Sequence, residues 1–170
     1  MTNLVLLRRQ MVEIGRRLQQ QNLIVAAEGN LSVRLGGRAF LVTPSGVGKG
    51  ALRVQDLLEI DLAGRCARGK PSSEWPLHRC IYEARPDVGA IFHGHDRMVT
   101  AQGAALNLPE TKEEKPSGSV ELLQQVMDIL GDEEFLVMKN HGFLALGSSM
   151  EEAGQLALRI KNTVSGKECR

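Results

Sequence analysis

Hydrophobic residues recur at three- and four-residue spacing in four stretches of the chain, a period that predicts amphipathic helices. The stretches are residues 3–22, 77–84, 120–130 and 150–164. Pro86 follows the second stretch and ends it, whereas Ser119 stands just before the third as a candidate N-cap. Asp96 is expected to open one further, shorter helix.

Alternating or continuous apolar runs separate these helices and predict strands. Residues 31–35 alternate, Gly36-Gly37 is a turn signal, and residues 39–42 form the return strand. Further strands are expected at residues 57–62, 89–95, 135–138 and 143–146. The order of elements predicts an α/β fold with a central mixed or antiparallel sheet flanked by helices. Since the chain shows no internal repeat or linker, we expect residues 1–170 to form a single domain.

Composition excludes several classes of function. The chain has 170 residues, a formal net charge of +1, one Trp and one Tyr, which argues against a nucleic-acid-binding surface. No apolar run reaches the roughly 20 residues of a membrane span, and no apolar segment at the N-terminus indicates a signal peptide. The widely spaced Cys66, Cys80 and Cys169 form no disulfide framework, so a cytoplasmic protein is expected.

Three of the four histidines occur where strands are predicted to end. His93 and His95 are two positions apart, so on a strand they point to the same side, and His141 follows another apolar run. Three neutral imidazoles bind Zn²⁺, or another divalent metal, and leave a coordination position open for substrate. Such a metal polarises a substrate carbonyl and stabilises an enediolate. A carboxylate beside it can move the proton, and Glu74 is the first candidate for this base, ahead of Glu28.

Two segments are candidate anion sites. Residues 43–50 form a glycine-rich loop that contains Ser45 and Gly46, and Ser72 and Ser73 precede the helix at residues 77–84. Backbone amides in both places can bind a phosphate. The alternatives, an ordinary loop and a helix cap made by one of the serines, stay open on these residues alone.

Four segments together resemble the class II aldolase/adducin head-domain family: residues 28–33, 41–46, 71–75, and His93-Gly94-His95 with Asn140-His141-Gly142. The resemblance implies a class II aldolase-like fold, Zn²⁺ bound by His93, His95 and His141, and Glu74 as the catalytic acid/base. The phosphate pocket that it implies consists of Asn30, Ser45, Gly46, Ser72 and Ser73. Enzymes of the family are commonly homotetramers with sites at subunit interfaces, which implies a homo-oligomer.

The chain departs from the aldolases of this family in its tyrosines. Their proton donor to the departing aldehyde is a tyrosine, but the only tyrosine here, Tyr82, lies within a predicted helix. Water, His78 or a different reaction would have to fill that role. The leading hypothesis is a zinc-dependent aldolase acting on a small, phosphorylated keto-sugar. The alternatives are a metal-dependent sugar-phosphate epimerase or dehydratase, and a non-catalytic adducin-like interaction module.

Overall fold

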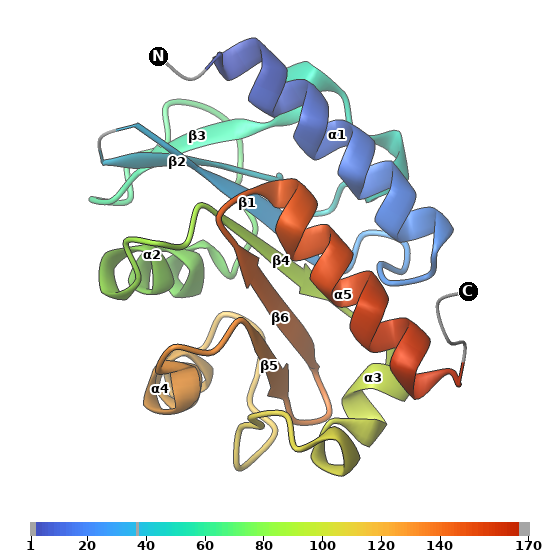
Figure 1. The fold of residues 1–170 in the computed structure, drawn as a ribbon. Helices are drawn as coiled ribbons and strands as arrows, with labels where there is room; N and C mark the ends of the chain where they lie inside the picture. Colours follow the sequence, from blue (N-terminus) through green and yellow to red (C-terminus); the bar gives the residue numbers. More distant parts are fainter. Residues whose placement is uncertain (1–2, 37, 167–170) are drawn as a thin grey trace.

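A six-stranded sheet forms the centre of the computed structural model, which describes residues 3–36 and 38–166. Its strands are β1 (Asn30–Leu35), β2 (Ala39–Val42), β3 (Leu58–Asp61), β4 (Ala90–Gly94), β5 (Phe135–Met138) and β6 (Gly142–Gly147). They lie in the order β3-β2-β1-β4-β6-β5, and each neighbouring pair is antiparallel (Figure 1). The sheet predicted as mixed or antiparallel is therefore antiparallel. The predicted turn at Gly36-Gly37 falls partly on residue 37, outside the described residues.

Helices cover both faces of this sheet. They are α1 (Leu4–Gln20), α2 (Trp75–Ala84), α3 (Arg97–Gln102), α4 (Val120–Leu130) and α5 (Met150–Val164). Short 3-10 turns are η1 (Lys49–Ala51), η2 (Val54–Asp56) and η3 (Ala104–Leu106). Helices α1, α3 and α5 pack on one face, and α2 and α4 lie on the other (Figure 1). The result is a three-layer α/β fold, as the order of elements predicted.

The two layers of helices enclose two hydrophobic cores, because successive strand residues point to opposite faces. On β4, Phe92 packs with Met11 under α1 and α5, whereas Ile91 packs with Ile81 under α2 and α4. His93 shares the face of Ile91 and therefore points toward the start of α2. The alternation of β4 thus decides which helix a functional side chain on this strand can meet.

Helix caps agree with the sequence in two places and differ in one. The side chain of Ser119 accepts a hydrogen bond from Leu122 N at the start of α4, and Asp96 caps α3 in the same way. The N-cap of α2 is Glu74, whose side chain makes no capping hydrogen bond. The prediction that Ser72 or Ser73 caps this helix is therefore wrong, and the carboxylate of Glu74 is directed elsewhere.

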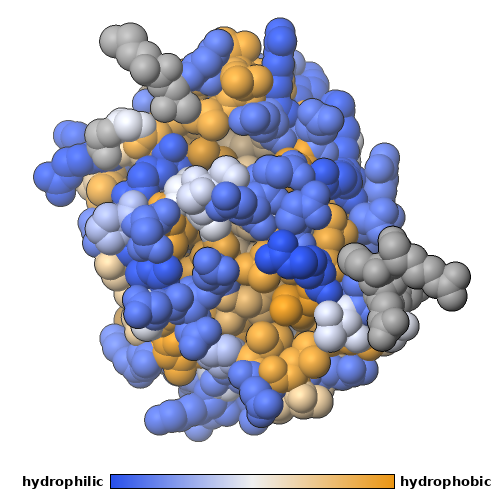
Figure 2. Space-filling model, in the orientation of Figure 1, coloured by the Kyte–Doolittle hydropathy of each residue, from blue (hydrophilic) through white to orange (hydrophobic). Residues whose placement is uncertain are grey.

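The surface is mostly hydrophilic on the face seen in Figure 1, with hydrophobic residues scattered between polar ones (Figure 2). Three consecutive hydrophobic residues in the first turn of α1, Leu4, Val5 and Leu6, are 39%, 54% and 53% exposed. Within the described part of the chain, no helix combines the length and hydrophobicity that crossing a bilayer requires.

Candidate metal centre and active site

The three histidines singled out by the sequence converge at one end of the sheet. His93 lies near the end of β4, His95 follows that strand, and His141 lies in the turn between β5 and β6. Strand β4 ends at Gly94, so the predicted strand 89–95 is one residue too long at each end. One nitrogen from each of the three imidazoles lies within 4.8 Å of the others. The antiparallel pairing of β4 with β6 and of β6 with β5 brings these distant segments together.

Hydrogen bonding around His93 leaves one of its nitrogens free for a ligand. The Nδ1 atom lies 3.0 Å from the carbonyl oxygen of Phe143, which accepts its N–H. The Nε2 atom then carries the lone pair and points into the cluster, 2.8 Å from His95 Nε2. Because burial lowers the pKa of His93, and lowers that of His95 to about 3, both imidazoles are neutral at neutral pH. Neutral imidazole is the form that binds a metal ion.

The His141 imidazole supplies the clearest sign that the cluster fits a cation. Its Nε2 atom is buried and has no hydrogen-bond partner of good geometry in the described part of the chain, but Glu74 Oε1 lies 3.1 Å away and raises the pKa of His141. Without an ion, a proton can bridge two of the three converging nitrogens, as between His95 Nε2 and His93 Nε2, and a divalent cation would take the place of such a proton. A set of three histidines fits Zn²⁺ best and leaves a fourth position open.

The Glu74 carboxylate lies against this cluster. Its residue is 2% exposed, Oε2 lies 3.1 Å from His93 Nε2, and Oε1 lies 3.1 Å from His141 Nε2. Burial by itself raises the pKa of Glu74, but the neighbouring His93 and His141 imidazoles and the amide of Asn30 stabilise the carboxylate more. The pKa of Glu74 therefore lies well below its ordinary value, and the group is an ionised base at neutral pH. The second candidate, Glu28, is exposed and lies 3.7 Å from His95.

Two further side chains fix the orientation of Glu74. Asn30 Nδ2 donates to Oε2 at 2.8 Å, and Ser117 Oγ donates to Oε1 at 3.2 Å. Asn30 is placed by the sheet, because it pairs in register with His93 across β1 and β4, so both side chains share one face. Each oxygen of Glu74 therefore contacts one histidine and one hydrogen-bond donor.

A pocket of about 280 Å³ opens beside Glu74 and the histidines. All five residues of the expected anion site line it: Asn30, Ser45, Gly46, Ser72 and Ser73. Gly46 has a φ of +75°, which the turn after β2 requires and which favours glycine. The structure thus brings the glycine-rich loop and the start of α2 to the same cavity as the histidines.

Two residues that line this pocket were missed in the sequence. Ser117 comes from the connection before α4, where the sequence indicated only a helix start, and its only signal was the Ser-Gly pair before Ser119. Lys49 comes from the glycine-rich loop, where a lysine is ordinarily exposed, yet this residue is 1% exposed.

A second pocket, of about 670 Å³, adjoins the histidines on the other side. It shares Glu28, His95 and His141 with the first pocket and extends along Arg97, Thr100 and Asn140. His95 and His141 therefore line both pockets, of which one is rich in hydroxyl and amide groups and the other is bounded by the start of α3.

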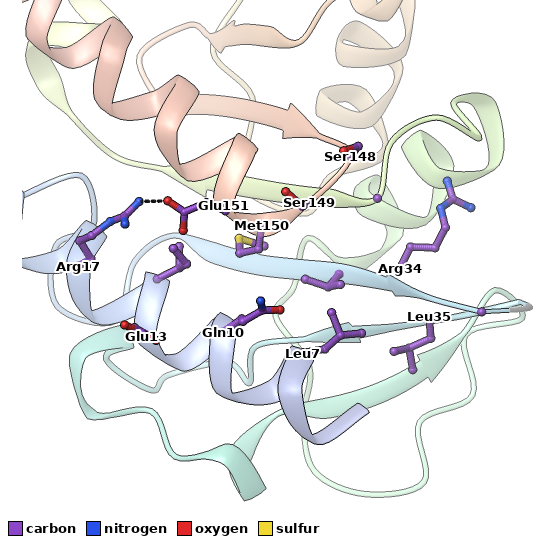
Figure 3. A pocket seen from close by; sticks show the side chains of 14 residues that line it. Leu7, Gln10, Glu13, Arg17, Arg34, Leu35, Ser148, Ser149, Met150 and Glu151 are labelled. Carbon is purple, nitrogen blue, oxygen red and sulfur yellow. Dashed lines mark hydrogen bonds and ion pairs between the residues drawn. The ribbon is translucent and has the colours of Figure 1, made fainter. Parts of the chain in front are cut away.

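Another cavity, of about 530 Å³, lies away from the histidines, between α1, the start of α5 and the far end of β1 (Figure 3). Arg17 and Glu151 form an ion pair of 3.0 Å across one side of it. None of the predicted site residues lines this cavity. The candidate active site therefore lies elsewhere, at the other end of the sheet.

The remaining histidine and the tyrosine lie in the core rather than in the pocket. Ser32 Oγ lies 2.7 Å from His78 Nδ1 and 2.8 Å from the Tyr82 hydroxyl. Burial lowers the pKa of His78 to about 3 and raises that of Tyr82. Because neither side chain lines the pocket beside Glu74, neither is placed to donate a proton to a substrate there.

The sequence and the fold are similar to those of known proteins. The sequence model described as Class II Aldolase and Adducin N-terminal domain matches residues 9–165. The chain is 33% identical over 160 residues to an L-fuculose phosphate aldolase of Methanocaldococcus jannaschii, covering 86% of this chain and 87% of that protein. It is 40% identical over 103 residues to a methylthioribulose-1-phosphate dehydratase of Acidiphilium cryptum, covering 59% and 49% of the two chains. The crystal structure of L-fuculose-1-phosphate aldolase from Thermus thermophilus superimposes with a TM-score of 0.80 at 28% identity, covering 94% and 91%.

Proposed function

The chain belongs to the class II aldolase and adducin N-terminal domain family, and we propose that it is a zinc-dependent lyase acting on a small phosphorylated keto-sugar. It would cleave or form the bond between the carbon atom beside the substrate carbonyl and the hydroxyl-bearing carbon atom beyond it. The observation that carries this proposal is the position of Glu74, whose two carboxylate oxygens each lie 3.1 Å from a histidine of the metal cluster. A base so close to a metal site serves a reaction in which a proton moves beside a polarised carbonyl.

His93, His95 and His141 would hold the metal ion through their Nε2 atoms. A bound divalent ion supplies a Lewis acid that draws electron density from the substrate carbonyl. Another divalent metal could replace zinc, because imidazole binds several ions of similar size. The protein would orient the imidazoles, as the hydrogen bond from His93 Nδ1 to Phe143 O does, and burial keeps those of His93 and His95 neutral.

Glu74 would carry the proton. In the cleavage direction its carboxylate removes a proton from the hydroxyl group beyond the bond that breaks. The electron pair of that bond moves to the carbon beside the carbonyl, and the proton is then delivered to this carbon. The hydrogen bonds from Asn30 and Ser117 hold Glu74 in one orientation for both transfers.

The substrate would span the two pockets that share Glu28, His95 and His141. Its phosphate group fits the smaller pocket, where Asn30, Ser45, Gly46, Ser72 and Ser73 offer hydroxyl and amide donors. The rest of the sugar fits the larger pocket along Arg97, Thr100 and Asn140. Such an arrangement places the reacting carbon atoms beside the histidines that both pockets share.

A dehydratase or an epimerase of the same family is the second candidate. The chain has one tyrosine, and its buried hydroxyl group is hydrogen-bonded to Ser32, so the tyrosine that exchanges a proton with the aldehyde oxygen in aldolases of the family has no counterpart among the residues of this pocket. The similarity to a protein named methylthioribulose-1-phosphate dehydratase also favours elimination of water. A non-catalytic adducin-like module is the third candidate, but such a module has no use for a base oriented against three convergent histidines.

Product analysis tests the proposal. Zinc-loaded protein is incubated with L-fuculose 1-phosphate, methylthioribulose 1-phosphate and other ketose phosphates, and the products are identified by mass spectrometry. An aldolase yields two carbonyl fragments, whereas a dehydratase yields one product lighter by a water molecule and an epimerase conserves mass. No turnover of any ketose phosphate, together with failure to bind a divalent metal, would support the interaction module.

A homo-oligomer is part of the proposal. The exposed Leu4, Val5 and Leu6 at the start of α1 give a hydrophobic surface that an assembly could cover. Light scattering of the purified protein would measure the oligomeric state. A tetramer is expected, because enzymes of the family are commonly homotetramers.

A further inference from the structure

Lys49 is a buried cation for which the described residues provide no counter-ion. The residue is 1% exposed, and its Nζ atom donates to the carbonyl oxygens of Ala27 at 2.8 Å and Val47 at 3.0 Å. Among residues 3–36 and 38–166, no carboxylate oxygen lies within 4.0 Å of this ammonium group. Buried charges are ordinarily paired, because an isolated charge in a protein interior is costly.

The fold holds Lys49 in this position. η1 packs against α1, and a Cβ atom built on Gly15 of that helix would lie 3.5 Å from Lys49 O. Because Gly15 has no side chain, the glycine-rich loop can lie close to α1. The side chain of Lys49 is buried where the two segments meet. Burial lowers the pKa of Lys49 to about 8, so the group is still mostly cationic at neutral pH.

Lys49 lines the pocket that carries the hydroxyl and amide donors, and its Nζ atom donates to the carbonyl oxygen of Ala27, which lines the same pocket. Glu28 and Glu74 line the same pocket, and Lys49 is the one lysine or arginine among its described lining residues. An ammonium group has three donors, and two of them are used by Ala27 and Val47, so one remains. The other groups of the predicted phosphate site, Asn30, Ser45, Gly46, Ser72 and Ser73, donate hydrogen bonds but carry no charge.

We propose that Lys49 is the charged group of this anion pocket and makes the site selective for phosphorylated over unphosphorylated substrates. The inference rests on the proposed function for the identity of the anion as a phosphate group. A phosphate dianion beside the ionised Glu74 is repelled, and a buried ammonium group offsets that repulsion where little solvent screens it. Lys49 would thus act on substrate binding, while Glu74 and the histidines act on the reaction itself.

Binding of inorganic phosphate to the zinc-loaded protein, measured by calorimetry, tests the role of Lys49 without any turnover. Lys49→Met removes the charge and keeps most of the buried stem, and it should weaken phosphate binding by about tenfold or more while the zinc content stays unchanged. Lys49→Gln keeps a hydrogen-bond donor for the carbonyl groups but no charge, and it should behave like Lys49→Met. Lys70→Met is the matched control, because Lys70 is exposed, its carbonyl group accepts from Ser45 N, and its side chain does not line the pocket.

The outcomes separate this inference from the proposed function. Wild-type phosphate binding by Lys49→Gln would mean that Lys49 only holds the Ala27 and Val47 carbonyl groups, and wild-type binding by Lys49→Met would likewise overturn the inference. Failure of the wild-type protein to bind phosphate would also overturn the inference. If wild-type protein binds phosphate through Lys49 but converts no ketose phosphate, the inference stands and the proposed function fails. Where a phosphorylated substrate is turned over, Lys49→Met should raise KM for it by about tenfold or more.

Discussion

Glu74 Oε2 and His93 Nε2 lie 3.1 Å apart, where the start of α2 meets the end of β4. The carboxylate is close enough to enter the coordination shell of a metal ion held by the histidines, and also to face a substrate bound there. Asn30 and Ser117 donate to its two oxygens and fix its orientation. The same carboxylate could therefore bind the ion in the absence of substrate and transfer the proton in the presence of substrate.

Substitution of this carboxylate separates the two roles. Glu74→Gln should retain zinc, because the three imidazoles remain, and should lower kcat by about 10²- to 10⁴-fold, because the amide cannot accept the proton. The measurement is steady-state turnover of the best ketose phosphate, with metal content determined by atomic spectroscopy. Glu83→Gln, on the same helix with its side chain 46% exposed, is the control and should retain wild-type activity. Unchanged turnover in Glu74→Gln would assign the base to another residue.

Loss of two imidazoles should abolish metal binding. The His93→Ala/His95→Ala variant leaves His141 as the one remaining histidine of the cluster, and a single imidazole binds zinc weakly. Zinc should raise the thermal unfolding temperature of the wild type, because a ligand that binds the folded state stabilises it, and should leave that of the variant unchanged. An equal zinc-dependent rise in both proteins would place the metal elsewhere.

The sequence predicts the centre of this site because its residues follow clear signals. His93 and His95 come at the end of an apolar strand, and Glu74 comes directly before a helix. The antiparallel register that sets Asn30 opposite His93 follows from alternation on strands that were themselves predicted. Residue types and strand ends therefore indicate much of the chemistry before any coordinates are known.

Lys49 and Ser117 could not be predicted, because their positions depend on packing between distant segments. Lys49 is buried because η1 packs against α1, and a lysine in a glycine-rich loop gives no local sign of this. Ser117 is the end of a connection that has no hydrophobic periodicity. This connection contacts β5 through the bridge between Glu110 and Val137 before it reaches the site. Tertiary contacts of this kind leave no period in the sequence.

A glycine on β6 should prove necessary for the position of His93. A Cβ atom built on Gly142 would lie 2.8 Å from His93 Cε1 and would also collide with the carbonyl oxygen of Gly94. Gly142→Ala should therefore displace the imidazole or separate β6 from β4, at a cost of about 1–3 kcal/mol in the free energy of unfolding. Zinc affinity, measured by competition with a chelator, should fall as well.

Gly36→Ala is the control for that substitution. Among the described residues other than its chain neighbours, no heavy atom lies within 4 Å of a Cβ atom built at Gly36, so this variant should keep the stability and zinc affinity of the wild type. If Gly142→Ala binds zinc as tightly as Gly36→Ala, the close contact between β6 and His93 has no role in forming the metal site.

The buried His78 should make the metal-free protein sensitive to acid. Its pKa is lowered to about 3 by burial, against about 6.5 in the unfolded chain, so the unfolded state binds more protons between these values. The stabilising contribution is complete above about pH 6.5 and is lost as the pH falls toward 3. Between about pH 7.5 and about pH 5, His78 alone should account for a loss of about 2 kcal/mol in the free energy of unfolding.

Chemical denaturation of metal-free protein at these two pH values measures that loss. His78→Gln keeps a hydrogen-bonding group near Ser32 Oγ but does not titrate, so its stability should fall by about 2 kcal/mol less than that of the wild type between the two pH values. Tyr82→Phe is the control, because it removes the other partner of Ser32 and should lower stability by about 1 kcal/mol at both pH values. Equal acid sensitivity in wild type and His78→Gln would show that His78 is protonated in the folded state.

The loss of stability that remains in His78→Gln belongs to groups such as His93 and His95, whose pKa values are also lowered by burial. Because zinc binds their neutral form, zinc should protect the protein against that remaining loss.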